Sequence, residues 1–472
     1  MGGVWAIMLG VVLGCIVSYG RNIPLAADWL MVAPLTGHEP DLAGWLWAQN
    51  NEHRVPLPRL LYLLLLKASG GDFRVGMVFN ALAMAALAAA MVLAARRLRG
   101  GTLRLSDAFF PVAFLHLGNW SNLVWSWQIQ FVLATVLTCG LLLVAVKHAG
   151  DLPPRDACIA GTCILLLPLS GANGLIFAVA MAPWLLFSAL RMRAVTARRD
   201  SVMAGYLLLA AVAGALLLTV LYFVGYQRAS WNPPSPGVGA TLKTAAKFLA
   251  LGFGPAARAW WGVTELLALG IAGSTLGLLL AALRRRDQGE RRRLFGLVSF
   301  AVGMATLALA LGWGRAGLLP RVGMPPRYVL LSVPALCLAY FVWQLYGPPR
   351  YRSAVQLGLL GVMLALLPFN TRAGFGWRNW YSAGMLQVEQ DIGAGLTAQE
   401  IAQRNGDFLL HWDQPGLVAF IEMLRASGNG PFAAIVFSGA EPSTESSTET
   451  SHGMDRRIVE VSRAPVRVVL PR

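Results

Sequence analysis

Long apolar runs interrupted by short arginine clusters constrain this sequence more than any other feature. A helix needs about 20 mostly apolar residues to cross the hydrocarbon core of a bilayer, whereas soluble domains are about 25% charged. Only 13% of the residues here are charged and 56% are hydrophobic. The sequence therefore predicts an all-α polytopic membrane protein of about eleven transmembrane helices, at residues 3–20, 74–95, 107–119, 129–147, 157–171, 174–191, 202–225, 262–283, 294–312, 328–346 and 354–369.

The arginine clusters predict an orientation for these helices. They lie in short loops on one side of the arrangement, at residues 96–104, 147–155, 191–199, 284–293 and 350–352. Cytoplasmic loops are enriched in Lys and Arg, so this side is expected to be cytoplasmic, together with the amino terminus. Arg21, just outside the first span, favours the opposite orientation. The net charge of +16 is explained by these loops, and no nucleic-acid partner is predicted.

The chain divides into a membrane domain and an outer tail. The membrane domain is predicted for residues 1–370, with a long first outer loop at 21–73, and the tail for 371–472. Residues 397–400 have capping-box spacing, and residues 458–470 have strand character. The Ser/Thr/Glu-rich residues 438–451 are typical of disorder. We therefore expect a small α+β extracytoplasmic module. The first helix lacks the features of a cleaved signal peptide and is expected to be retained.

Acidic residues are concentrated in the first outer loop. Asp28 follows the first span closely, where a partly desolvated carboxylate can act as a general base. Alternatively, Asp28 is a solvated loop acid or a helix cap. Glu52 and His53 precede a short apolar stretch suited to the membrane surface, so they place polar groups at that depth. The alternatives are that Glu52 pairs with Arg54 or Arg59 and that His53 is a hydrogen-bonded interfacial histidine.

A second group of candidates is cationic and lies on the predicted outer side. It comprises Arg228, Arg315, Arg321 and Arg327. Because positive residues are disfavoured on that side, and guanidinium groups match phosphate oxygens, these arginines predict an anion-binding site. The alternative is that they contact lipid headgroups or pair with the loop acids.

A third group alternates aromatic rings with side-chain amides over residues 119–130 and includes Trp125, Gln128 and Gln130. Sugars present apolar C–H faces and rings of hydroxyls, so such a surface suits a sugar. The alternative is an aromatic belt at the membrane interface. The 5 cysteines lie in apolar stretches without a C-x-x-C pair, so neither a disulfide framework nor a zinc site is predicted.

The order of these parts resembles the C-type (GT-C) glycosyltransferase superfamily of integral membrane enzymes. The resemblance covers residues 1–370 as architecture: an acid beyond the first helix, a long outer loop, many spans and an outer carboxy-terminal module. It rests on Asp28-Trp29, on Trp47 to Pro58, on Trp125 to Gln130, and on Gly314 to Tyr328. Members use polyprenyl-phosphate or polyprenyl-diphosphate sugars and transfer the sugar outside the membrane, commonly with inversion.

The resemblance implies roles for the candidate residues. Asp28 becomes the general base, and Glu52, with His53 beside it, orients or helps to deprotonate the acceptor. The four outer arginines become contacts for the donor phosphate. Arg54, Trp125, Gln128 and Gln130 become contacts for the sugar or for a glycan, lipid or protein acceptor. No Asp-x-Asp pair follows the first span, so a metal-independent enzyme without a cofactor is expected.

Two other functions fit the same residues. A transporter or flippase for a lipid-linked anionic glycan would also use outer arginines, and a non-catalytic assembly partner would use the tail as its interaction surface. The high ratio of Arg to Lys and the alanine-rich spans point to a GC-rich bacterial source, hence to the plasma (inner) membrane of a bacterium.

Overall fold

The computed structural model describes residues 2–195, 199–228, 232–285, 289–318, 324–409, 411 and 413–435. Within these ranges nine helices are long and apolar enough to cross a membrane. They are α1 (Gly2–Tyr19), α5 (Arg74–Leu98), α8 (Ile129–Lys147), α10 (Ala172–Val195), α11 (Arg199–Tyr222), α13 (Trp261–Arg284), α14 (Arg291–Arg315), α16 (Val329–Tyr346) and α17 (Pro349–Gly393). The protein is therefore a polytopic helical membrane protein, as the sequence predicted.

The other two predicted spans contain short, interrupted helices. Residues 107–119 form α6 (Phe109–Leu115) and the 3-10 helix η3 (Leu117–Asn119). The break falls at His116, which has the extended values φ −66° and ψ 146°. Residues 157–171 belong to α9 (Pro154–Leu166) and η5 (Leu167–Ser170). At 1.5 Å per residue, a helix the length of α9 extends only about 20 Å, so these two of the about eleven predicted spans are not helices of spanning length in the described residues.

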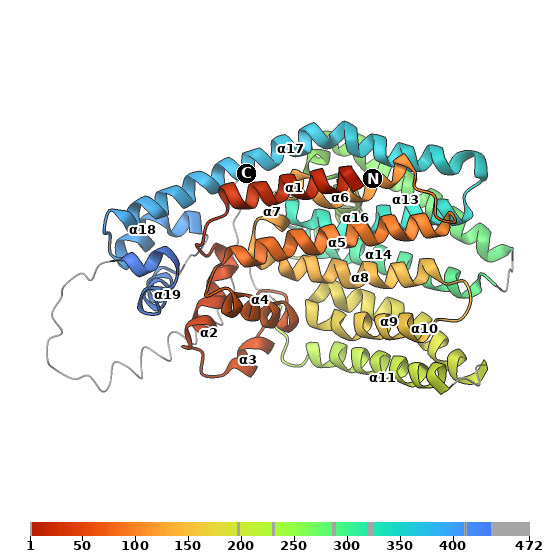
Figure 1. Ribbon diagram of the computed structural model, residues 1–472, viewed down its shortest axis with the longest axis horizontal. Helices are drawn as coiled ribbons and strands as arrows, with labels where there is room; N and C mark the ends of the chain where they lie inside the picture. The colour runs from red at the N-terminus through yellow and green to blue at the C-terminus, as the bar shows by residue number, and fades with distance from the viewer. Residues whose placement is uncertain are drawn as a thin grey trace.

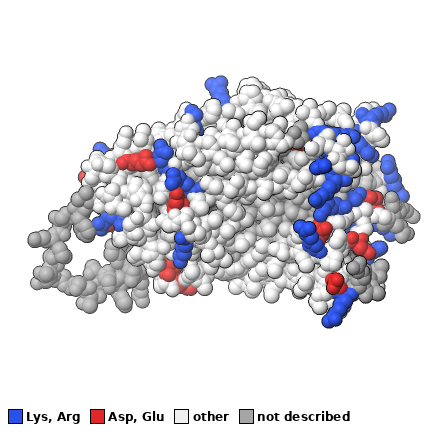
Figure 2. Space-filling view, viewed as in Figure 1, with Lys and Arg blue, Asp and Glu red and all other residues white. Residues whose placement is uncertain are grey.

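The helices run side by side between two chemically different ends (Figure 1). At the arginine-rich end lie residues 99–105, 148–153, 284–285, 289–291 and 347–349. The loop end carries residues 20–73, 116–128, 223–228, 232–260, 316–318 and 324–328. Lys and Arg gather at one end of the visible face, and an uncharged belt covers its middle (Figure 2). Apolar side chains on the outer surface of the bundle, such as Leu266 and Val220, are 73% and 66% exposed, which is expected where lipid surrounds the helices.

The first outer loop folds into short helices at the loop end. They are η1 (Ala26–Met31), α2 (Val32–Thr36), α3 (Leu42–Trp47) and α4 (Pro56–Ala68). Asp41 caps α3 by accepting a hydrogen bond from the Gly44 amide at 2.8 Å, and Pro56 begins α4, where a missing N–H is tolerated. Further short helices at this end are α7 (Trp120–Leu123), η4 (Ser126–Gln128), α12 (Val238–Ala250), η6 (Leu251–Phe253), η7 (Pro255–Trp260) and η8 (Pro326–Tyr328).

Helix α17 joins the membrane domain to the tail. Its 45 residues correspond to about 68 Å, whereas the hydrocarbon core is about 30 Å thick. The helix follows one edge of the bundle and continues past the loop end (Figure 1). The predicted domain boundary at residue 370 therefore falls inside a continuous helix.

The described part of the tail is helical. It contains α18 (Ala398–Leu409), α19 (Gln414–Ala426) and η9 (Gly430–Ala434). Thr397 and Glu400 make the expected capping box: the Thr397 amide donates to Glu400 at 2.8 Å and the Glu400 amide donates to Thr397 at 3.3 Å. The predicted α+β module is not supported, because amphipathic helices form the described tail; residues 438–451 and 458–470 lie outside the described ranges.

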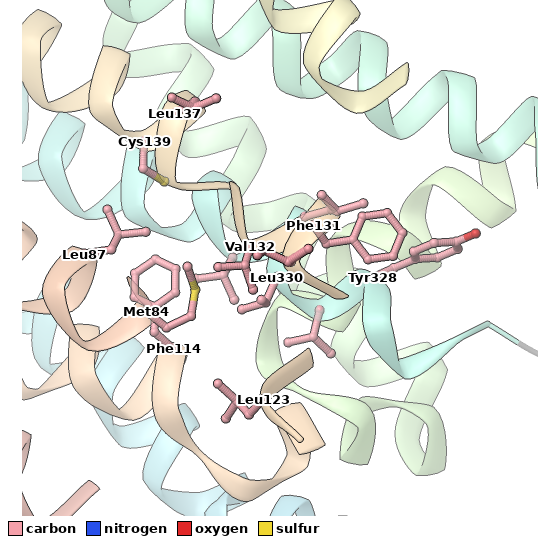
Figure 3. Close-up of a cluster of buried hydrophobic side chains, with 14 of the residues drawn as sticks. Met84, Leu87, Phe114, Leu123, Phe131, Val132, Leu137, Cys139, Tyr328 and Leu330 are labelled. Atoms are coloured by element: carbon pink, nitrogen blue, oxygen red, sulfur yellow. The ribbon is translucent and has the colours of Figure 1, made fainter. Parts of the chain in front are cut away.

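The core sits where α5, α6, α8 and α16 meet. In the span that contains α16, 83% of the most apolar window is buried, against 22% for the span that contains α13. Figure 3 shows Met84, Phe114, Phe131 and Leu330 from these four elements packed together. Helix α16 is therefore central in the bundle, and α13 is peripheral.

Candidate functional site

Two groups of polar residues lie at the loop end, and the first is centred on Glu52. Its Oε2 atom accepts a hydrogen bond from Arg315 Nη2 at 2.8 Å, and its Oε1 atom accepts one from Asn232 Nδ2. Arg315 Nε donates to the Tyr328 hydroxyl at 3.0 Å. We call Glu52, His53, Asn232, Arg315, Arg327 and Tyr328 the Glu52 cluster. Its members come from the first outer loop, the chain before α12, the end of α14 and η8.

His53 and Arg327 extend this cluster into the protein. Burial lowers the pKa of His53 to about 4; Glu52 opposes this shift, and Arg315 and Arg327 reinforce it. His53 is therefore neutral near pH 7. Among the described residues, the buried atoms His53 Nδ1 and Arg327 Nη1 have no hydrogen-bond partner. The cluster thus offers an uncommitted guanidinium N–H beside a neutral imidazole.

The turn that presents Glu52 is strained and pinned. Asn51 has a φ of +52°, a left-handed conformation that Asn tolerates better than most residues. Arg54, two residues after Glu52, donates to the carbonyls of Tyr222 at 3.1 Å, Trp47 at 2.8 Å and Val224 at 2.9 Å. Arg54 was predicted to contact a sugar or acceptor; its donors are instead engaged in holding the loop against α11.

The alternative pairing of Glu52 with Arg54 or Arg59 is not what the structure contains. Arg59 is buried and donates to the carbonyls of Trp45 and Ala48, so it anchors α3 to α4. Of the other predicted phosphate ligands, Arg228 is exposed at the loop end, with one donor 3.5 Å from the Asn232 carbonyl. Arg321 lies outside the described residues.

The second group surrounds Asp28. This residue is only 2% exposed; its carboxylate accepts hydrogen bonds from the Leu25 amide at 3.2 Å and the Tyr62 hydroxyl at 3.1 Å. Trp125 Nε1 donates to the Leu25 carbonyl at 3.1 Å. We call Leu25, Asp28, Tyr62 and Trp125 the Asp28 pocket. Trp125, predicted to contact a sugar, is buried and supports this pocket.

Burial sets the protonation state of the Asp28 pocket. It raises the pKa of Asp28 from 3.8 to about 7, although the hydrogen bonds from Leu25 and Tyr62 and the neighbouring Trp127 and Trp125 act in the opposite direction. Burial also raises the pKa of Tyr62 well above its ordinary value. The phenol therefore stays protonated and donates a hydrogen bond to the Asp28 carboxylate. Asp28 is not a solvated loop acid and is not fully ionised at neutral pH. The hydrogen bond that it accepts from the Leu25 amide caps η1, so the helix-cap alternative is what the structure contains.

The tail packs against Trp29, the residue that follows Asp28 in the chain. Trp29, which is fully buried, contacts Phe420 of α19, Phe432 of η9 and His411, with ring centroids 6.4, 5.9 and 6.5 Å apart. The sequence could not show this contact, because about 390 residues separate Trp29 from Phe420. The tail therefore contacts the residue next to Asp28, whose own hydrogen-bond donors, Leu25 and Tyr62, both belong to the first loop.

Residues 116–128 contribute buried polar atoms, and among them only His116 lies outside the group of amides and aromatic rings that the sequence singled out. Within the described part of the chain, His116, Asn119, Asn122 and Gln128 each have a buried side-chain N or O atom without a hydrogen-bond partner. An unsatisfied buried polar group costs about 1–3 kcal/mol. Elements η3 and α7 of this segment pack against η8, which carries Arg327. Gln130, also predicted as a sugar contact, is half-buried at the start of α8.

No group of three or more His, Cys, Asp or Glu side chains that could hold a metal ion occurs in the described part of the chain. At the Glu52 cluster, the groups that can donate to a ligand are the guanidinium groups of Arg315 and Arg327 and the Asn232 amide, and such donors suit an oxyanion. No protein-family model, curated protein or solved structure matches this chain.

Proposed function

We propose that this protein is a membrane glycosyltransferase that moves a sugar from a polyprenyl-phosphate carrier to an acceptor on the outer side of a bacterial plasma membrane. The observation that carries the proposal is the meeting of Arg315 and Arg327, from different helices, beside Glu52 and a neutral His53. The architecture that resembles GT-C enzymes, with its acid beyond the first helix, supports the same reading. The arginine-rich end is then cytoplasmic, as the positive-inside rule expects.

The chemistry assigned to this site is an inverting substitution at the anomeric carbon. The acceptor hydroxyl gives its proton to Asp28 and its oxygen bonds to that carbon. The bond from the carbon to the phosphate oxygen breaks, and the phosphate leaves with the electron pair. Arg327 Nη1 and Arg315 neutralise the charge that develops on the phosphate, which lowers the barrier. A general base works best when its pKa lies near the working pH, and the pKa of Asp28 meets that condition.

Glu52 has a different role in this proposal. Its carboxylate pairs with the Arg315 guanidinium and accepts a hydrogen bond that a phosphate oxygen of the donor would otherwise accept. Arrival of the donor displaces Glu52 and leaves it beside the sugar, where it orients the acceptor. Because Asp28 is nearly inaccessible, the acceptor reaches it only when the tail contacts at Trp29 open.

The proposal is tested by transfer of label from a panel of polyprenyl-phosphate sugars to glycan, lipid and protein acceptors, with purified protein and a chelator present. We expect chelator-resistant transfer by the wild type. In Arg327→Gln the KM for the donor should be at least tenfold higher, since a hydrogen bond to a charged group contributes about 1.5–3 kcal/mol. The matched control is Arg74→Gln, which removes a cation at the loop end that pairs with Asp72.

Each outcome decides between the proposal and its rivals. Donor binding without transfer to any acceptor would favour a flippase for the lipid-linked glycan. If the wild type does not bind the donor, and neither Arg327→Gln nor Arg74→Gln differs from it, the assembly-partner role would be favoured. Loss of transfer on chelation would contradict metal independence.

A further inference from the structure

A surface of arginines and exposed leucines lies at the arginine-rich end, at the other end of the bundle from the Glu52 cluster and the Asp28 pocket. Two segments form it: the chain that leads from α5 into the 3-10 helix η2 (Leu105–Ala108) and the start of α17 (Figure 1). Arg104 Nη1 donates to Ser353 Oγ at 2.9 Å, so the two segments are in contact. We call Leu103, Arg104, Leu105, Arg350, Arg352 and Leu357 the Arg104 surface.

The loop that carries Arg104 is held by a buried ion pair. Arg99 Nη2 lies 2.5 Å from Asp107 Oδ2, and the two side chains are 3% and 0% exposed. The same carboxylate accepts hydrogen bonds from the Tyr340 hydroxyl of α16 at 2.7 Å and from the Arg104 amide at 2.9 Å. The backbone at Arg104 is therefore fixed, and a ligand of its side chain does not have to order the loop.

The cations of the Arg104 surface are not neutralised by the protein. Among the ion pairs between described residues, none includes Arg104, Arg350 or Arg352. The acids of the adjoining elements, Asp107 and Glu290, are paired with other arginines. Three guanidinium groups thus gather where the two segments meet, and their charge is left for an external anion.

Two contacts orient the arginines of α17. Arg352 Nε donates to the Gly347 carbonyl at 2.7 Å, and the Arg350 guanidinium lies 4.5 Å from the centroid of the Tyr351 ring. Since a guanidinium has five N–H donors, each keeps donors for a ligand. Lys and Arg gather at this end of the visible face (Figure 2). A phosphate group can therefore accept hydrogen bonds from more than one arginine.

Exposed leucines stand beside these arginines. Leu103 and Leu105 flank Arg104 and are 47% and 67% exposed. Leu357, one turn beyond Ser353 on α17, is 45% exposed, and residues four apart lie on the same side of a helix. Because α5 and α17 are long enough to span a membrane, their ends lie at the depth of the lipid headgroups. A lipid presents both a phosphate and acyl chains there, whereas a free anion does not contact leucines.

We propose that the Arg104 surface binds the phosphate of an anionic phospholipid from the surrounding leaflet, with the leucines against its acyl chains. Basic pockets near the ends of membrane helices bind anionic headgroups in this way. A zwitterionic phospholipid brings its own ammonium group beside the phosphate, so it gains less from the three arginines. The assignment does not depend on the proposed function, because no residue of the Glu52 cluster or the Asp28 pocket takes part.

The start of α9 offers a matched control. Arg155 and Arg350 are each the second residue of a helix that begins with proline, and both are exposed at the arginine-rich end. Arg155 is followed by Asp156, which pairs with Lys147, whereas the first turn of α17 contains no acidic residue. Arg155→Gln and Arg350→Gln therefore remove the same charge from the same local setting, but only Arg350→Gln acts on the Arg104 surface.

The experiment titrates the purified protein in a neutral detergent with phosphatidylglycerol or phosphatidylcholine and counts bound lipids by native mass spectrometry. We expect phosphatidylglycerol to bind more tightly. Arg104→Gln and Arg350→Gln should each weaken its binding about fivefold, and the double variant about 25-fold, whereas Arg155→Gln should bind it as the wild type does. The changed side chains are exposed, and thermal unfolding of the lipid-free variants checks that each is folded.

Glycerol phosphate distinguishes a lipid site from a site for a free anion. It carries the phosphate without acyl chains, so the wild type should bind it about tenfold or more weakly than phosphatidylglycerol, because buried CH₂ groups add to binding. Leu105→Ser should weaken binding of phosphatidylglycerol alone. Equal affinity for glycerol phosphate and phosphatidylglycerol would overturn the lipid assignment. Equal binding of the two phospholipids, or of phosphatidylglycerol by the wild type and the double variant, would overturn the site itself.

Discussion

The Asp28 pocket and the Glu52 cluster hold two carboxylates of one outer loop in opposite environments. Asp28 accepts hydrogen bonds from neutral donors and has a pKa raised to about 7 by burial. Glu52 pairs with Arg315 at 2.8 Å, and its side chain is 17% exposed. Asp28 thus has a pKa close to neutral pH, whereas Glu52 is paired with the cation of Arg315.

This difference separates two chemical tasks. Environments that treat two carboxyl groups differently are how one site obtains both a proton acceptor and a fixed charge. The Asp28 pocket is suited to exchange a proton with a substrate, and the Glu52 cluster to exchange one anion for another. Each prediction below changes one of the two groups and leaves the other as it is.

The largest effect is expected for Asp28→Asn. Asn keeps the size of Asp, and its amide oxygen can accept one of the two hydrogen bonds, because Leu25 donates to Oδ2 and Tyr62 to Oδ1 of the native carboxylate. The amide cannot take a proton from the acceptor. Sugar transfer should fall by about 100- to 10,000-fold, and the dissociation constant of the donor should be unchanged. Undiminished turnover would remove Asp28 from the base role.

Changes to the Glu52 cluster should act on binding. Arg315→Gln should weaken donor binding by about 10- to 100-fold, whereas Glu52→Gln should tighten it about fivefold, because the internal competitor for Arg315 is lost and such a pair contributes about 1 kcal/mol. Calorimetric titration with polyprenyl phosphate measures both. Weaker binding in Glu52→Gln would contradict the displacement of Glu52 by phosphate.

The pH dependence should come from the Asp28 pocket. Asp28 must be ionised to act as a base, so kcat/KM should rise with pH up to about 7 and level off above it, falling about tenfold for each pH unit below. The folded pKa of about 7 exceeds the ordinary 3.8, so the folded state binds more protons between these values. Stability should therefore decrease from about pH 4 to about pH 7. Melting temperatures of Asp28→Asn should lose this dependence.

The smallest effect concerns the backbone beside each acid. Ala26, two residues before Asp28, has a φ of +51°, a conformation that disfavours residues with a Cβ by about 1–2 kcal/mol. Ala26→Gly should raise stability by up to about 1 kcal/mol, and Asn51→Gly should change it less, since Asn already tolerates such angles. Thermal unfolding in detergent measures both; destabilisation by Ala26→Gly would show that Ala26 is not strained.

Hydropathy predicted where helices cross the membrane but not where they end. Helix α17 continues through Asn370 and Arg372 to Gly393, because leaving the bilayer changes the solvent and not the backbone preference of these residues. The segments at 107–119 and 157–171 are apolar enough to count as spans, yet breaks at His116 and Leu167 shorten their helices. An apolar segment can be buried in lipid or inside the protein, so its apolar content could not distinguish a membrane span from a short buried helix.

For the candidate site, residue chemistry was more informative than position. The outer acids and arginines could be selected because their charge is unexpected near a membrane, and Glu52, His53, Arg315 and Arg327 do lie together. Asn232 and Tyr328 were missed because polar loop residues carry no such signal. The packing of the tail on Trp29 was missed because it involves Phe420 and Phe432, whose contacts no local pattern encodes.

The contact between Trp29 and the tail also has a consequence for biosynthesis. The loop that carries Trp29 emerges early, whereas Phe420 is made about 390 residues later. At roughly 5–20 residues per second, about 20–80 s pass between the synthesis of Trp29 and the synthesis of Phe420. During that interval Trp29 is a ready ligand for a chaperone or the insertion machinery, and a ribosome stalled before α19 would release a chain with this surface permanently uncovered.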